Sequence, residues 1–134
     1  MRPFFSIVTP FNSWNEERRE SFYRAVKSVE NQTFKDFEWI VVNDGSTDDS
    51  KTVLDALKER GMIDHLIHFE TNRGACVARN EGAKLATGKY FSFLPADAIL
   101  YPGMARIWYE GLEEFKDYDF MYGGYRLIGD DGEP

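Results

Sequence analysis

The chain has 134 residues, the size of one ordinary domain, and 16 lysines and arginines against 23 aspartates and glutamates give a net charge of −7. This acidic balance, without a basic run, argues against a general nucleic-acid-binding protein. Hydrophobic residues make up 43% of the chain, which argues against intrinsic disorder. No apolar stretch approaches the roughly 20 residues that cross a bilayer, and no signal-peptide pattern is visible. The single cysteine, Cys76, cannot form an internal disulfide, so we expect a cytoplasmic protein.

The predicted elements alternate between strands and helices from the start of the chain. Residues 4–9 predict a short buried strand, and residues 16–29 predict an amphipathic helix with charged residues on its outer face. Residues 39–42 are apolar without alternation, which is typical of a central parallel strand covered on both faces. Capping residues 48–50 then open a second helix that ends at Gly61.

The same alternation continues through the second half. A third strand is predicted around 66–69, a third helix over 74–86 and a fourth strand over 90–94. A last helix runs from Pro102 to about residue 115, and a last strand is expected near 120–122. The apolar stripe of the last helix is expected to face the core, and it consists of Met104, Ile107, Trp108 and Leu112.

Alternating strands and helices with short connections favour an α/β, Rossmann-like fold with a mostly parallel central sheet flanked by helices. In such sheets ligands bind beyond the carboxyl ends of the strands, and here polar segments follow those ends at 9–12, 43–48, 70–73 and 95–98. The glycine fingerprints of dinucleotide dehydrogenases and P-loop NTPases are absent from the sequence. No acidic pair follows the first strand, which disfavours a receiver-type domain as well.

Two segments have residues suited to binding a nucleotide, although each also has a plain structural explanation. Residues 43–48 could be a turn and a helix cap, but a carboxylate there, Asp44, can accept a hydrogen bond from a base or a ribose. Residues 72–82 open a helix that carries Arg73 and Arg79. Helix N–H groups and guanidinium groups favour an anion such as a diphosphate, whereas a pair of surface arginines is the alternative.

Several ordered motifs resemble the family 2 glycosyltransferases, which have a GT-A nucleotide-sugar fold, and the resemblance covers nearly the whole chain. The motifs are SIVTPFN at 6–12, QTF at 32–34, VVNDGSTD at 41–48, NRG at 72–74, ARNEG at 78–82 and ATGKY at 86–90. The resemblance implies transfer of a sugar from a nucleoside diphosphate sugar to an acceptor hydroxyl, in the synthesis of a glycan or polysaccharide.

The resemblance also implies roles for individual residues. Thr9, Pro10 and Phe11 would line the base pocket, with the Phe11 ring able to stack on a uracil-type base. Asp44 would accept a hydrogen bond from the base, which favours a uridine donor. Arg79 would lie near the diphosphate.

The family's Asp-x-Asp motif would fall on residues 95–97, where this sequence departs from the pattern. Pro95 takes the first acidic position, Ala96 the middle nucleotide-binding position, and Ala98 the acidic position that often follows. Asp97 matches the metal-contacting carboxylate. Mg²⁺ or Mn²⁺ could be held there by one carboxylate, two phosphate oxygens and water molecules.

The catalytic residue is not identified from this sequence. In the family, the general base and the acceptor pocket come from the half that follows, and nothing after Tyr122 supplies that base. Residues 129–134 are typical of a hairpin turn without its return strand. We therefore expect residues 1–134 to be the nucleotide-sugar-binding part of one GT-A domain, cut before its acceptor half. Any association with the inner face of the membrane would require parts beyond this half.

Two alternatives stay open. Pro95 and Ala98 fit a non-catalytic, nucleotide-binding pseudoenzyme on the same fold, and the aromatic-rich composition fits a plain α/β interaction domain. For Cys76, which lies among small residues on a predicted helix, we expect a buried and unreactive thiol.

Overall fold

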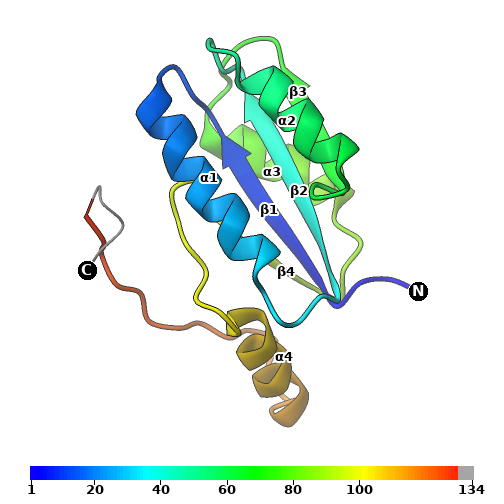
Figure 1. The fold of residues 1–134 in the computed structure, drawn as a ribbon. Helices are drawn as coiled ribbons and strands as arrows, with labels where there is room; N and C mark the ends of the chain where they lie inside the picture. The colour runs from blue at the N-terminus through cyan, green and yellow to red at the C-terminus, as the bar shows by residue number, and fades with distance from the viewer. Residues whose placement is uncertain (130–134) are drawn as a thin grey trace.

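A computed structural model describes residues 1–129 of the chain (Figure 1). The hairpin turn predicted for 129–134 therefore falls almost wholly outside the described residues. Strands and helices alternate as the sequence predicts, in the order β1 Phe5–Phe11, α1 Glu16–Glu30, β2 Phe37–Asp44, α2 Ser50–Glu59, β3 His65–Phe69, α3 Ala75–Leu85, β4 Tyr90–Phe93 and α4 Met104–Glu114. Within residues 1–129, no helix is long and apolar enough to cross a membrane.

The four strands form one parallel sheet in the order β3-β2-β1-β4. β1 and β2 pair along their whole length, with Phe11 opposite Asn43 where β1 ends. Helices α1 and α2 cover one face of the sheet and α3 covers the other, while α4 lies below the sheet (Figure 1). This arrangement is an α/β fold whose first two strands end side by side, so that the loops that follow them meet at one edge.

The core on the α1 and α2 side follows from the two-residue period of the strands. Ile7 and Trp39 point to this face and pack with Phe22 of α1 and Leu54 of α2, all of them essentially without solvent exposure. Each such side chain contributes about 2 kcal/mol by leaving water. The central strands are therefore fixed, and the loops at their ends start from a rigid base.

Helix α3 lies unusually close to the opposite face of the sheet. A Cβ placed on Gly82 would sit 2.5 Å from Val8 and 3.2 Å from Val42, so a larger residue would push the helix away. The helix N-terminus is thereby held near the carboxyl ends of β1 and β2, where the sequence predicts the nucleotide site.

Three sequence expectations differ from the structure. The prediction of a strand at 120–122 is wrong, because these residues have no hydrogen-bonded sheet neighbour and the side chains of Phe120 and Tyr122 are largely exposed. The apolar stripe of α4 is core-facing only in part, since Leu112 is buried whereas Ile107 is 59% exposed. Cys76 is exposed, because it lies on the side of α3 that faces away from the sheet. The opposite side of α3, with Ala78 and Gly82, packs against the sheet.

A buried carboxylate ties the amino-terminal end of the sheet together. Glu38 of β2 accepts hydrogen bonds at Oε1 from Ser6 Oγ at 2.5 Å, Thr87 N at 2.6 Å and Thr87 Oγ1 at 3.0 Å. Gly88 N in turn donates to Ser6 Oγ at 2.8 Å, and His65 Nε2 lies 3.3 Å from Glu38 Oε2. Burial alone would raise the pKa of Glu38, but these hydrogen bonds outweigh it and lower the pKa. The ATGKY segment at 86–90 thus has a structural role.

We predict that Glu38→Gln lowers the free energy of unfolding at neutral pH by about 2 kcal/mol, because a charged acceptor of several hydrogen bonds is lost. The lowered pKa means that this contribution is present above the ordinary value of 4.5 and is lost as the pH falls through the folded-state pKa. Urea unfolding between about pH 7 and about pH 3 measures both effects. Glu59→Gln, an exposed carboxylate on α2, is the control. A Glu38→Gln variant with the acid dependence of the wild type would contradict this account.

Candidate functional site

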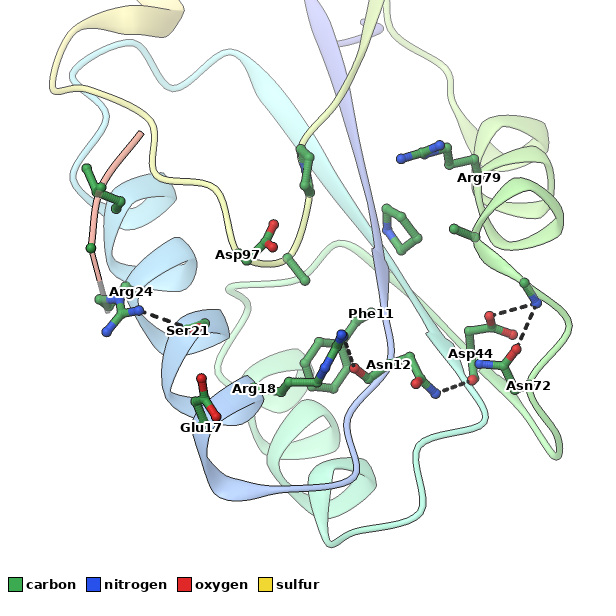
Figure 2. Close-up of a pocket in the computed structure, with 17 residues that line it drawn as sticks. Phe11, Asn12, Glu17, Arg18, Ser21, Arg24, Asp44, Asn72, Arg79 and Asp97 are labelled. Carbon is green, nitrogen blue, oxygen red and sulfur yellow. Dashed lines mark hydrogen bonds between the residues drawn. The ribbon is translucent and has the colours of Figure 1, made fainter. Parts of the chain in front are cut away.

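A cavity of about 610 Å³ opens at the carboxyl ends of β1, β2 and β4 (Figure 2). Its walls are built from the end of β1, the first three turns of α1, the end of β2, the start of α3, the loop after β4 and residues 128 and 129. This is the edge at which a parallel α/β sheet places a ligand.

The structure brings most of the predicted site residues to this cavity. The predicted residues that line it are Pro10, Phe11, Asp44, Arg79, Ala96 and Asp97. Thr9 does not line it: the side chain is fully buried beneath α1 and α2, and its Oγ1 accepts a hydrogen bond from Trp39 Nε1 at 2.9 Å. Thr9 therefore supports the strand beneath the cavity.

Asp44 joins three of the walls. Its Oδ1 accepts from Arg73 N at 2.6 Å, its Oδ2 accepts from Gly74 N at 3.0 Å, and its backbone oxygen accepts from Asn12 Nδ2 at 2.7 Å. The residue is 3% exposed, so water hardly reaches its carboxylate, and the two backbone N–H groups take the place of water as donors. The carboxylate thus fixes the start of α3 against the ends of β1 and β2, and each oxygen retains a second lone pair for a ligand.

The loop after β2 passes so close to the loop before α3 that only glycine fits between them. Gly45 has a φ of +66°, and a Cβ there would lie 2.3 Å from both Asn72 N and Thr71 C. Together with the Asp44 hydrogen bonds, this contact fixes the position of Asn72 on the cavity wall.

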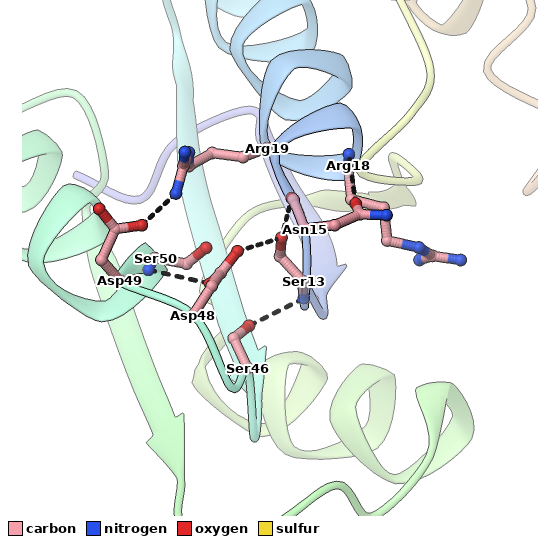
Figure 3. A network of polar contacts seen from close by, with 8 residues as sticks. All are labelled: Ser13, Asn15, Arg18, Arg19, Ser46, Asp48, Asp49 and Ser50. Carbon is pink, nitrogen blue, oxygen red and sulfur yellow. Dashed lines mark hydrogen bonds and ion pairs between the residues drawn. The ribbon is translucent and has the colours of Figure 1, made fainter.

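The loop between β1 and α1 is held by a separate polar network (Figure 3). Ser13 N donates to Ser46 Oγ at 3.0 Å, Ser13 Oγ donates to Asp48 Oδ2 at 2.6 Å, and Thr47 N donates to Ser13 O at 3.0 Å. Burial raises the pKa of Asp48, but the hydrogen bonds from Ser13 and Ser50 outweigh it and lower the pKa. Asp48 therefore serves as a charged anchor for the loop and does not line the cavity.

Arginines face the cavity from two sides. Figure 2 shows Arg79 on the α3 wall and both Arg18 and Arg24 on the α1 wall, with the Asp97 loop beside them. The Arg79 Nε is buried without a hydrogen-bond partner among residues 1–129, and its guanidinium Cζ lies 5.5 Å from the centre of the Phe93 ring. A buried donor without a partner is costly, so an anionic ligand in this cavity would supply what Arg79 lacks.

A divalent cation fits this site only if the ligand brings most of the donors. Asp97 lies in a turn closed by a hydrogen bond from Ala98 N to Pro95 O at 3.0 Å, and its carboxylate is the kind of hard oxygen that Mg²⁺ prefers. Among residues 1–129, no three histidine, cysteine or acidic side chains lie close enough together to hold a metal ion. Asp97 is compatible with a Mg²⁺-type ion that is also bound to phosphate oxygens and water.

Sequence reasoning missed the α1 wall. Residues 16–19 are expected to face solvent, yet Glu17, Arg18, Ser21 and Arg24 line the cavity. Positions 17, 21 and 24 share one helix face, and α1 begins directly after the carboxyl end of β1. The place of α1 in the sequence could have predicted this wall, because a helix that starts at a ligand-binding edge presents its first turns to the ligand.

Comparisons with known proteins agree with this geometry. The family model described as glycosyl transferase family 2 matches residues 6–133. TuaG of Bacillus subtilis (strain 168), named as a glycosyltransferase, is 32% identical over 133 residues, which cover 99% of this chain and 51% of TuaG. The glycosyltransferase GlyG of Streptococcus pneumoniae is 31% identical over 125 residues, which cover 93% of this chain and 40% of GlyG. The chain thus spans about half or less of the length of these relatives.

Solved structures show the same fold. Staphylococcus aureus TarS residues 1–349, crystallised in complex with UDP, superposes with a TM-score of 0.73 at 23% identity, covering 87% of this chain and 33% of that TarS chain. The mannosyltransferase PcManGT from Pyrobaculum calidifontis, in complex with GDP-Man and Mn²⁺, gives a TM-score of 0.63 at 22% identity, covering 80% of this chain and 31% of PcManGT. These likenesses show a GT-A fold, and the match of the family model over residues 6–133 shows that the chain belongs to glycosyl transferase family 2.

Proposed function

We propose that this chain binds the donor in a glycosyltransferase that moves a sugar from a uridine-linked nucleoside diphosphate sugar to an acceptor hydroxyl of a glycan or polysaccharide. The observation that carries the proposal is the cavity at the strand ends, which is lined by both Asp97 and Arg79, whose Nε has no hydrogen-bond partner among residues 1–129. A diphosphate needs cationic donors and a cation-binding oxygen together. The expected cytoplasmic location is part of this proposal.

Different residues would bind the base, the diphosphate and the cation. Pro10, Phe11 and Asp44 lie at the joined ends of β1 and β2 and would hold the base. Arg79 would donate to the diphosphate from the α3 wall, and the N-terminus of α3 adds a favourable dipole for an anion. A Mg²⁺ or Mn²⁺ ion held by Asp97 would act as a Lewis acid that stabilises the departing diphosphate. Ala96 would approach the donor through its backbone, since its methyl group has no polar atom.

A second function, nucleotide binding without catalysis, is favoured by one specific observation. The loop after β4 offers the cation only Asp97, because Pro95 and Ala98 stand at the two other acidic positions of the motif. The complete protein would then bind a nucleotide without transferring or hydrolysing its sugar. Sugar release from a nucleotide sugar by the complete protein, lost in Asp97→Ala, would reject this alternative.

We predict that UDP binds to the wild-type chain and that Mn²⁺ strengthens the binding. Asp97→Ala should remove most of this enhancement, with a loss of about tenfold in affinity, because the loop no longer contributes an oxygen ligand. Calorimetric titration with UDP, with and without Mn²⁺, measures both effects. Asp117→Ala removes an exposed carboxylate outside the cavity and should bind like the wild type. Failure of the wild type to bind any nucleoside diphosphate, with or without metal, would refute the proposal.

We predict that Asp44→Asn weakens UDP binding, because an amide cannot accept both backbone hydrogen bonds and the start of α3 loosens. Its matched control is Asp64→Asn, which removes a carboxylate that accepts from Trp39 N at 2.7 Å at the far end of β2. Asp44→Asn should lose about 2 kcal/mol of stability and bind UDP more weakly, whereas Asp64→Asn keeps an amide oxygen that can accept its one hydrogen bond and should bind UDP like the wild type. Equal UDP affinities in the two variants, measured by calorimetry on folded protein, would contradict the role of Asp44.

A further inference from the structure

The cavity offers the base little aromatic surface at the end of β1. The side chain of Phe11 is 2% exposed, and its ring centre lies 4.4 Å from that of Phe22, inside the core. The ring therefore forms the floor beneath the cavity and has only a small area to share with a ligand. A nucleobase usually gains a large part of its affinity by stacking on a flat group, so another planar surface is needed.

The side chain of Arg18 has the required shape and position. It lines the cavity from the first turn of α1, and its Cζ lies 3.8 Å from the centre of the Trp14 ring. Trp14 is 55% exposed, so the indole supports the guanidinium at the surface instead of packing in the core. The guanidinium carbon thus lies over the indole ring while the side chain borders the cavity.

The backbone of Arg18 is fixed at the start of α1, and its side chain has one polar contact within the described part of the chain. Its backbone N donates to the Asn15 side chain at 3.1 Å, which caps α1, and its Nη1 makes a weak contact with Asn12 O at 3.5 Å. Ser13, which precedes Trp14, is fixed by the network shown in Figure 3. No carboxylate among residues 1–129 forms an ion pair with Arg18. No acid in this range therefore competes with a ligand for the guanidinium.

The contact with Asn12 places Arg18 at the base end of the cavity. Asn12 also donates to the backbone oxygen of Asp44, the residue proposed to bind the base. We propose that the donor base stacks on the Arg18 guanidinium, which Trp14 supports from the other side. This inference rests on the proposed function and adds a base-binding residue to it. A guanidinium stacks on a base through its planar face, whereas a lysine ammonium has no such face.

The test compares uridine with UDP, because uridine lacks phosphates. Affinities for both are measured by NMR titration and calorimetry for the wild type, Arg18→Ala, Arg18→Lys and Trp14→Ala. Arg18→Ala and Arg18→Lys should each weaken the binding of uridine and of UDP roughly tenfold, with an unchanged ratio between the two. Trp14→Ala should give a smaller loss, because it removes only the support. Arg106→Ala, an exposed arginine on α4, should match the wild type.

The outcomes separate this inference from the proposed function. If Arg18→Lys binds uridine as well as the wild type does, or if Arg18→Ala weakens only UDP, Arg18 acts by charge and the stacking is refuted. If the wild type binds both ligands and Arg18→Ala binds them equally well, this inference fails and the proposed function stands. If the wild type binds neither ligand, both fail. Circular dichroism of each variant checks that α1 and the fold are intact.

Discussion

Two buried carboxylates on β2 hold helix α3 at both of its ends, and the rest of the site depends on them. Asp44 accepts from the backbone N–H groups of Arg73 and Gly74 just before the helix, and Glu38 accepts from Thr87 just after it. The two acids are six residues apart, so both point to the sheet face that α3 covers. A buried charge is tolerated only when donors surround it, and here most of the donors belong to the flanks of one helix, with Ser6 Oγ of β1 as a further donor to Glu38.

This double attachment explains why a fixed cavity forms at the strand ends. With α3 held against β1 and β2 by the two acids and by the close contact at Gly82, Arg79 has a defined place on the cavity wall. The opposite wall is positioned differently, through the network of Ser13 and Asp48 that holds the start of α1. The two walls carry arginines, and the Asp97 loop lies beside them (Figure 2). The geometry suits a ligand with a flat group and an anionic group.

Local patterns in the sequence were enough to predict the eight described helices and strands, because apolar runs, caps and glycine stops act over a few residues. The strand-end segments also predicted that Asp44 and Asp97 would lie at one edge, since parallel strands end together, whereas the place of Arg79 was implied by the family resemblance. Other features depend on packing between distant segments. The cavity-facing side of α1, the exposure of Cys76 and the partial exposure of the α4 stripe each depend on how a helix is rotated against its neighbours. The strand expected at 120–122 has the right residue types, but a strand also needs a partner.

The central claim is that the cavity beside Asp44 is the nucleotide site. Amide chemical shifts of the ¹⁵N-labelled chain, recorded while UDP and Mg²⁺ are added, test it most directly because they report on every part of the fold at once. The account predicts that the largest changes occur at Asn12, Arg18, Gly74, Arg79 and Asp97. Changes confined to the hollow that Phe91, Phe93 and residues 119–123 line on the other side of β4 would contradict it.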